Sequence, residues 1–102
     1  MIQVITVATA EQHHLLLEFN TGEWRRFDMR PYLGYPVFRR LAYRGFFELA
    51  HVDYGTVVWP GDIDIAPETL YEGSVPVDPA VSESRDSISN DLGAKQPLNQ
   101  NS

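Results

Sequence analysis

Few residue types in this chain could support metal chemistry, and their spacing does not bring them together. Histidine occurs only at His13, His14 and His51. Adjacent histidines in a strand point to opposite faces of a sheet, so His13 and His14 cannot easily share one metal ion. His51 would have to join one of them across the sheet. We therefore expect no metal site, and nothing in the sequence indicates a cofactor.

The acidic residues offer a second candidate site, near the end of the aromatic-rich part of the chain. Asp62 and Asp64 followed by Glu68 superficially suggest a calcium site. The spacing of oxygen ligands and the glycine of an EF-hand loop are missing, however. Capping of a following helical turn by Asp62 or Asp64 is the preferred interpretation. No other pair of carboxylates is selected by its spacing.

Nucleophilic catalysis lacks its usual residues. The chain has no cysteine, which excludes thiolate chemistry and disulfides. Neither a Gly-x-Ser-x-Gly elbow nor a glycine-rich phosphate loop occurs. The hydroxyl nucleophiles before the C-terminal segment are all threonines, at Thr6, Thr9, Thr21, Thr56 and Thr69. We predict that the protein is not an enzyme.

The arginines and tyrosines in the middle of the chain form the remaining candidate site. Residues 24–44 hold six arginines against Asp28, although the formal net charge of the whole chain is −6. These cations could pair with the acidic flanking segments or leave a basic patch for an acidic partner. Tyr with Arg is enriched at interface hot spots. The candidate partner-binding residues are Arg25, Arg26, Tyr32, Tyr35, Arg39, Arg40, Tyr43 and Arg44.

The structural alternative for the same residues stays open at this point. Arginine stems could cover a helix, and the tyrosines could form the rim of the core. The acidic net charge makes nucleic-acid binding by the chain on its own an unfavoured interpretation, because such binding depends on cations that neutralise phosphates.

The elements that must position these residues belong to a small α+β domain. Residues 2–7, 13–19 and 24–28 read as strands, and Asn20 to Glu23 as a hairpin turn. The pattern does not decide which face of 24–28 is buried. An amphipathic helix is expected over 37–44, after Pro36.

A second hairpin is expected over 46–53 and 56–59, followed by a helical turn over 66–71. The predicted fold class is therefore α+β, with a small antiparallel sheet of about four to five strands in two hairpins and one or two short helices. Exposed edges in so small a sheet make a homodimer by sheet pairing an expected alternative to the monomer.

Aromatic residues stop at Tyr71, which divides the chain in two. We predict a folded domain over 1–73 and a disordered acidic and polar tail over 74–102. Within the tail, Val81, Ile88 and Leu92 could form a weak apolar stripe if a partner ordered them. The N-terminus does not resemble a signal peptide, and no apolar run is long enough to span a membrane, so we expect a cytoplasmic protein without membrane contact.

A set of motifs resembles one known family. They are Leu15 to Phe19, Asn20-x-Gly22-Glu23, Phe27 to Pro31, Val37-Phe38, Phe46-Phe47 and the closing run from Trp59-Pro60 through Asp62 and Asp64 to Pro67-Glu68-Thr69-Leu70-Tyr71. This pattern is similar to the domain-of-unknown-function 2442 family (DUF2442) of small bacterial proteins, over residues 1–73. The resemblance implies a compact α+β fold with no established active site. Some members resemble a fusion to a helix-turn-helix, which is not recognisable after Tyr71, and others resemble partners of a neighbouring small protein in toxin–antitoxin pairs.

These observations lead to a non-catalytic protein-interaction module as the expected function. The resemblance makes it an antitoxin-like partner of a small protein, such as a toxin, with an acidic tail that folds or wraps on binding. The alternatives are a DNA-binding or transcription-regulatory accessory that uses an arginine-rich strip, and an orphan domain whose tail is only a linker.

Overall fold

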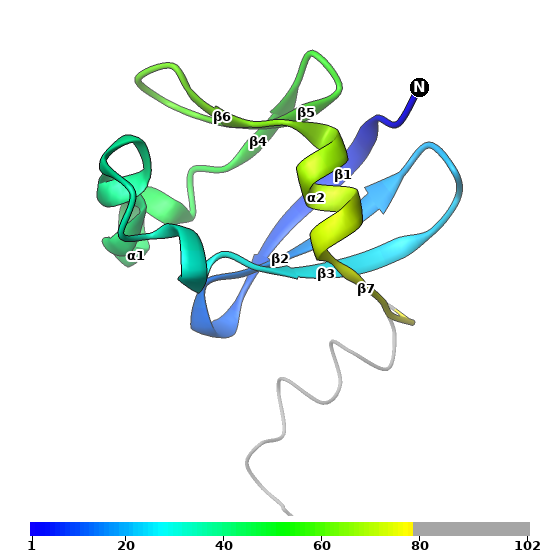
Figure 1. Ribbon diagram of the computed structural model, residues 1–102, viewed down its shortest axis with the longest axis horizontal. Coiled ribbons are helices and arrows are strands. Elements are labelled where there is room, and N and C mark those ends of the chain that lie inside the picture. The colour runs from blue at the N-terminus through cyan, green and yellow to red at the C-terminus, as the bar shows by residue number, and fades with distance from the viewer. Residues whose placement is uncertain (79–102) are drawn as a thin grey trace, which may run out of the picture.

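Two antiparallel sheets build the domain in the computed structural model, which describes residues 1–78 (Figure 1). The first sheet has four strands in the order β1-β2-β3-β7, and the second has three in the order β4-β5-β6. In chain order the strands are β1 (Val4–Ala10), β2 (His14–Phe19), β3 (Trp24–Asp28), β4 (His51–Asp53), β5 (Thr56–Trp59), β6 (Ile63–Ile65) and β7 (Val75–Pro76).

Short helices connect the strands. Helix α2 links β6 in the second sheet to β7 in the first (Figure 1). Among residues 1–78, no helix has the length and apolarity that crossing a membrane requires. The helices are α1 (Arg44–Phe47), α2 (Pro67–Gly73) and the 3-10 helices η1 (Glu11–His13), η2 (Arg30–Tyr32) and η3 (Pro36–Ala42).

Strand β2 shows how the first sheet divides into a core face and an outer face. Leu15, Leu17 and Phe19 are each at most 1% exposed and belong to the core cluster. Because side chains alternate along a strand, Leu16 points to the opposite face, and it is not part of that cluster. Three consecutive leucines thus serve two different surfaces.

The register between β2 and β3 settles the faces of β3. Arg25 lies opposite Leu17 and Phe27 lies opposite Leu15, so both point toward the core side. Trp24, Arg26 and Asp28 therefore lie on the outer face of the sheet.

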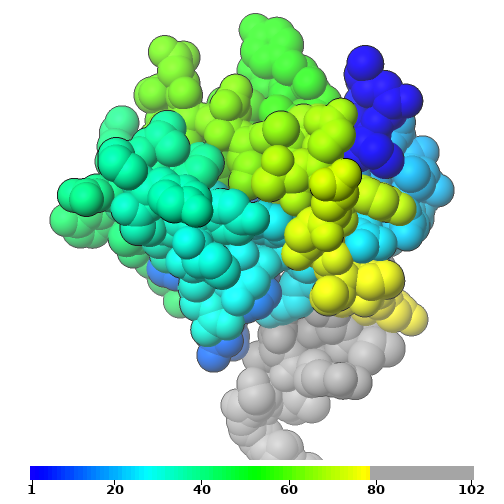
Figure 2. Space-filling view, viewed as in Figure 1, coloured from blue at the N-terminus to red at the C-terminus, as the bar shows by residue number. Residues whose placement is uncertain are grey.

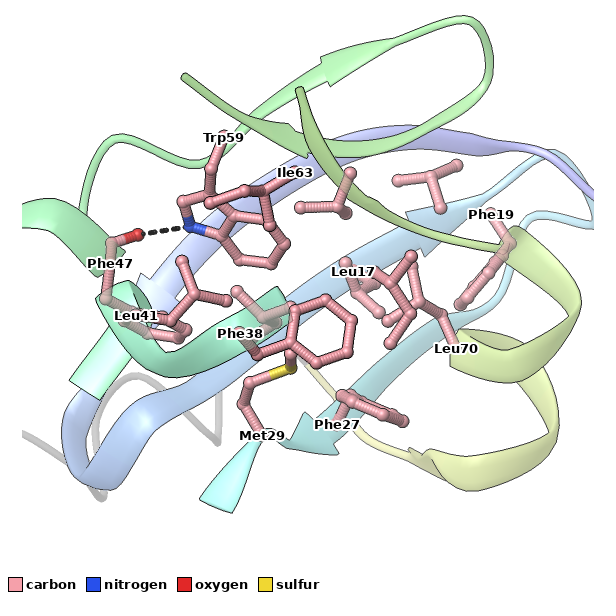
Figure 3. Close-up of a cluster of buried hydrophobic side chains, with 14 residues drawn as sticks. Leu17, Phe19, Phe27, Met29, Phe38, Leu41, Phe47, Trp59, Ile63 and Leu70 are labelled. Carbon is pink, nitrogen blue, oxygen red and sulfur yellow. Dashed lines mark hydrogen bonds between the residues drawn. The ribbon is translucent and has the colours of Figure 1, made fainter. Parts of the chain in front are cut away.

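The core fills the space between the two sheets (Figure 3). Trp59 from β5 is fully buried, and its indole Nε1 donates a hydrogen bond of 2.9 Å to the carbonyl oxygen of Phe47 in α1. Leu70 from α2 and Leu41 from η3 are also 0% exposed. Each sheet alone is too small to bury an apolar face, so the helices and both sheets share one core.

The predicted α+β class is confirmed, with more strands than expected. The strands predicted over 24–28 and 56–59 lie where the sequence placed them. The additional strands are β6 and β7, with three and two residues. Strands this short cannot display an alternating pattern, and for that reason the sequence does not reveal them.

The strand predicted over 46–53 is wrong in its first half. Phe46 and Phe47 lie in α1, where Phe47 N donates to Tyr43 O at 2.9 Å, and β4 begins only at His51. A short apolar run has no period that separates a strand from a buried helical turn. Here the helical turn delivers Phe47 to Trp59, with a ring-centroid separation of 6.1 Å.

The predicted capping of α2 by Asp62 or Asp64 is also wrong. Ala66 is the N-cap residue, and no side chain caps the helix. Asp62 instead occupies the turn before β6 with φ of 62°, and Asp64 is an exposed β6 residue opposite Val58. Asp tolerates positive φ better than most residues, which suits it to this turn.

The ordered sheet continues past the predicted boundary at residue 73. Ser74 is buried, and β7 pairs with β3 through Val75 opposite Arg26. The predicted disordered tail of 74–102 therefore begins within the sheet. Its remainder, residues 79–102, lies outside the described residues.

We predict that Trp59→Phe lowers the free energy of unfolding by about 2 kcal/mol, because it removes a buried hydrogen bond and part of a packed ring. Urea unfolding followed by circular dichroism at neutral pH measures the change. Trp24→Phe is the matched control, since Trp24 lies half-buried on the outer face. Equal losses in both variants would contradict the central place of Trp59 in the core.

Candidate functional site

The segment from Tyr35 to Tyr43 presents its side chains in a three-residue period. Phe38 and Leu41 are buried, whereas the positions between them are exposed. A 3-10 helix has three residues per turn, so residues i and i+3 lie directly above one another. One row of η3 therefore faces the core, and the other two rows face outward.

This geometry corrects the α-helix predicted over 37–44. The observed helix spans Pro36–Ala42 and is 3-10 throughout, and its last turn closes with Tyr43 N donating to Arg40 O at 3.2 Å. Tyr43 is then extended, and α1 starts anew at Arg44. Burial of Phe38 and Leu41 on one row is the physical reason, because their spacing of three residues matches the 3-10 period.

The outward rows carry large apolar side chains. Tyr35 is 57% exposed, Val37 56% and Tyr43 76%. Together with exposed Arg39 they form what we call the η3 surface, on the segment that projects at the left of the molecule in Figure 2. Large apolar groups gathered on a short exposed segment are typical of an interaction surface.

Arg39 is the cation of this surface. Within residues 1–78 it makes no hydrogen bond, ion pair or ring contact. The two other arginines of this segment are engaged: Arg40 lies 4.4 Å above the Phe46 ring, and Arg44 Nε lies 2.9 Å from Glu48 Oε2. Arg39 is therefore the charge that remains available to a partner.

Tyr32 supports the η3 surface from beneath. It is half-buried, and its ring centroid lies 5.4 Å from that of Phe27, 6.4 Å from that of Phe38 and 6.1 Å from that of Tyr35. Such tilted and edge-to-face ring contacts are favourable. Tyr32 thus links Tyr35 to the core.

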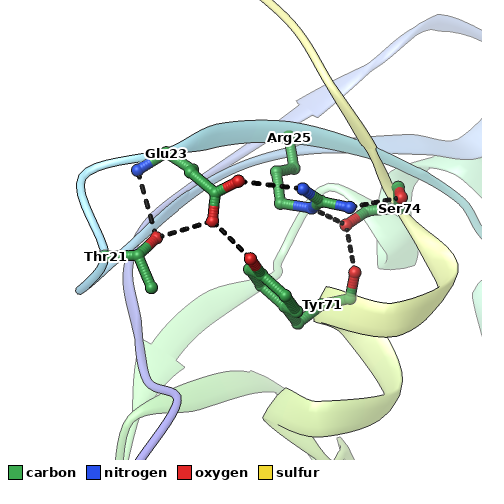
Figure 4. Close-up of polar contacts among 5 residues, drawn as sticks. All are labelled: Thr21, Glu23, Arg25, Tyr71 and Ser74. Atoms are coloured by element: carbon green, nitrogen blue, oxygen red, sulfur yellow. Dashed lines mark hydrogen bonds and ion pairs between the residues drawn. The ribbon is translucent and has the colours of Figure 1, made fainter.

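Arg25 lies in a different part of the domain, in a polar network that joins β3 to α2 and β7 (Figure 4). Its Nε donates to Ser74 Oγ at 2.7 Å and its Nη2 to Ser74 O at 2.8 Å, while Nη1 pairs with Glu23 Oε2 at 3.1 Å. Its guanidinium also lies 4.4 Å above the Tyr71 ring. These contacts identify Arg25 as a structural residue.

Glu23 is the acceptor at the centre of this network. Tyr71 donates its hydroxyl to Glu23 Oε1 at 2.5 Å, and Thr21 donates to the same oxygen at 2.9 Å. The Tyr71 hydrogen bond, followed by that of Thr21, lowers the pKa of Glu23. The same bond to the carboxylate raises the pKa of Tyr71 above its ordinary value.

Arg26 points away from Arg25, to the outer face of the first sheet. The five arginines of the proposed basic strip, Arg25, Arg26, Arg39, Arg40 and Arg44, therefore do not form one strip within a single copy of the chain. The sequence overlooks this separation because it shows the local abundance of arginine but not the face on which each one lies.

The remaining polar candidates form small structural pairs. Arg30 Nη2 lies 2.9 Å from Asp28 Oδ2, and this interaction is the first cause that lowers the pKa of Asp28 to about 2. His14 Nε2 lies 3.8 Å from the same carboxylate. Within residues 1–78, no three His, Asp or Glu side chains are grouped as metal ligands.

The edge formed by β7 bears on the predicted homodimer. Val77 N donates to Trp24 O at 2.9 Å, so by alternation the nitrogen of Pro76 faces away from β3. Proline at that position offers no donor to a further strand. Edge pairing through β7 is therefore disfavoured, and the homodimer stays a prediction for the other edges.

Two contributions to these sites are not apparent in the sequence. Val37 looks like a core residue of an amphipathic α-helix, but the 3-10 period turns it outward. The contacts of Glu23 and Arg25 with Tyr71 and Ser74 join residues nearly 50 positions apart, a separation of 49 for Arg25 and Ser74. Only the pairing of β7 with β3 reveals them.

The fold and these surfaces define a small α+β domain of two antiparallel sheets, with an exposed aromatic and basic segment and polar groups used mainly for structure. The chain belongs to the family described as a protein of unknown function, DUF2442, whose model matches residues 4–76. No curated protein matches the chain. No solved structure matches it either.

We predict that Glu23→Gln lowers the pKa of Tyr71 toward its ordinary value near 10, because the hydroxyl no longer donates to a carboxylate. An alkaline titration of tyrosine absorbance, compared between wild type and variant, isolates the change. Glu48→Gln is the control, since Glu48 pairs with Arg44 instead. Superimposable titrations of wild type and Glu23→Gln would contradict the network.

We also predict different effects for two neighbouring arginines. Arg40→Ala lowers the free energy of unfolding by about 1 kcal/mol through loss of the ring contact with Phe46 and of the packed side-chain stem. Arg39→Ala changes it by less than about 0.5 kcal/mol. Thermal and urea unfolding of the two variants measure the difference. A larger loss for Arg39→Ala would show that Arg39 is structural and remove it from the η3 surface.

Proposed function

We propose that the chain is a non-catalytic protein-interaction module that binds its partner through the η3 surface. The observation that carries the proposal is the exposure of Tyr35, Val37 and Tyr43 around Arg39, a cation without a partner within residues 1–78. Aromatic residues and arginine are enriched at the energetic centres of protein interfaces, whereas such groups are costly to expose without a use.

The support beneath the η3 surface favours this role. Phe38 and Leu41 anchor η3 in the core, and Tyr32 holds Tyr35 by ring contact. Side chains on an anchored segment lose less conformational freedom on binding than those on a loose loop. A partner therefore meets a preorganised surface.

The chemistry of the surface specifies the partner in outline. It requires apolar groups to cover Tyr43 and Val37, and a carboxylate within reach of Arg39. A small cytoplasmic protein with an acidic, partly apolar face meets both requirements. The resemblance to family members found beside small proteins makes an antitoxin-like role, with such a protein as the partner, the finer form of this proposal.

The polar side chains support a role without catalysis. The carboxylates with shifted pKa values, Glu23 and Asp28, are engaged by Tyr71 and Arg30 in bonds that join elements of the fold. In functional sites such shifts accompany clefts and reactive neighbours, whereas here each shift follows from a structural bond.

Capture of partners by variants of the full chain tests the proposal. Tagged wild type, Arg39→Glu and Tyr43→Ser are exposed to lysate of the source cell, and retained protein and nucleic acid are both identified. Any retained protein is then purified, and its affinity for each variant is measured. We expect Arg39→Glu and Tyr43→Ser each to weaken binding by 10-fold or more, which corresponds to about 1.4 kcal/mol.

Tyr54→Asn is the matched control for this experiment. Tyr54 is 94% exposed but lies in the turn between β4 and β5 with φ of 53°, a conformation that Asn also tolerates. Loss of affinity in Tyr54→Asn equal to that in Tyr43→Ser would refute the η3 surface. Retention of DNA that decreases steeply with added salt would favour the regulatory alternative.

The contribution of the C-terminal segment to partner binding needs a deletion that starts at residue 79. A deletion from residue 74 would remove Ser74 and β7, and with them the bonds of Arg25. We expect a chain ending at Asp78 to keep the circular-dichroism spectrum of the full chain and to bind the partner more weakly. Unchanged affinity would exclude a role of residues 79–102 in partner binding.

A further inference from the structure

The outer face of the first sheet carries an apolar strip that the core does not use. The register places Ala8 of β1 opposite Leu16 of β2, Leu16 opposite Arg26 of β3, and Arg26 opposite Val75 of β7. Trp24 lies on the same face, two residues before Arg26. We call Ala8, Leu16, Trp24 and Val75 the outer strip.

Exposure within the outer strip is uneven. Val75 is 58% exposed and Ala8 is exposed, whereas Leu16 is only 5% exposed although it points away from the core cluster. Trp24 is half-buried. The strip thus combines a deep apolar centre at Leu16 with accessible apolar groups on both edge strands.

The polar groups that border the strip pair with one another. On one side Thr6 donates to Glu18 at 2.8 Å, and on the other side His14 lies 3.8 Å from Asp28, which also pairs with Arg30. Paired groups at the border leave the centre of this face apolar. A segment that covers it would therefore present apolar side chains at the centre and polar ones at the border.

The path of the chain brings one segment to this face. Val75 belongs to the outer strip itself, and the bond from Val77 N to Trp24 O holds the chain beside Trp24 two residues later. Residues 79–102 follow directly. Among them Val81, Ile88 and Leu92 are spaced by seven and four residues, which places them on one stripe of a helix.

The reach of that segment matches the width of the sheet. Four strands separated by 4.8 Å span about 15 Å from β7 to β1. A helix over residues 80–92 would be about 20 Å long at 1.5 Å per residue. The segment is long enough to cross the face, and its tether gives it an effective concentration in the millimolar range that a second copy or a free partner does not have.

We propose that residues 79–92 dock on the outer strip of their own chain, with Val81, Ile88 and Leu92 against Leu16 and Trp24. The acidic residues Glu83, Asp86 and Asp91 fall outside that stripe. This docking is independent of the η3 surface, which lies on a segment that packs against the core side of the sheet.

Spin labelling of the full chain tests the docking directly. The chain has no cysteine, so Ser89→Cys carries a single nitroxide label beside Ile88. Paramagnetic broadening of nuclear magnetic resonance signals then reports which residues lie near the label. We expect loss of most of the signal intensity at Ala8, Leu16 and the Trp24 indole, with much less at Leu49 and Tyr54.

Two variants of the labelled chain separate docking from chance proximity. Ile88→Asp should restore the Ala8, Leu16 and Trp24 signals, whereas Leu98→Asp, outside the docking segment, should leave them broadened. Ile88→Asp should also raise quenching of Trp24 fluorescence by acrylamide, while Trp59, which is 0% exposed, provides a constant background.

Three outcomes would overturn the proposal. The first is weak, uniform broadening over the whole domain, and the second is broadening centred on Tyr35 and Tyr43. The third is broadening in a mixture of spin-labelled chains with separate isotope-labelled chains, which would identify a second copy as the occupant.

Discussion

The packing of two small sheets against one another around Trp59 and Leu17 is the constraint on which the rest of the domain depends. Both residues are 0% exposed, and neither sheet could bury its apolar face alone. The shared core determines where the connections must run. Helix α1 has to deliver Phe47 to Trp59, and α2 has to cross from the second sheet to the first while it contributes Leu70.

This constraint also explains how the arginines are used. Closing the domain brings Ser74 and Tyr71 back to the β2–β3 hairpin, where Arg25 and Glu23 meet them. Arg25 is thereby occupied by the closure of the fold, as Arg40 is by the ring of Phe46. What remains for a partner is set by which arginines the fold does not need, and on η3 that residue is Arg39.

Much of this arrangement could be predicted from the sequence, and the failures have specific physical causes. The strand over 24–28 has clear boundaries at Gly22 and Pro31, and it was located correctly. Phe46 and Phe47 were misplaced because a two-residue apolar run has no period. Val37 was assigned to the buried side because the assumed period was that of an α-helix, whereas η3 has a period of three residues.

The candidate partner-binding residues were chosen by local composition, which mixes side chains with different surroundings. Tyr35, Arg39 and Tyr43 lie together on one exposed segment, whereas Arg25 and Arg26 lie on opposite faces of β3. The outer strip was not predicted, because Leu16 between Leu15 and Leu17 reads as one more core residue. Since η3 packs Phe38 and Leu41 into the core side of the first sheet, the outer strip and the η3 surface are separated by the sheet itself. A ligand on one surface therefore leaves the other accessible, and a single chain can hold its own C-terminal segment while it binds a partner.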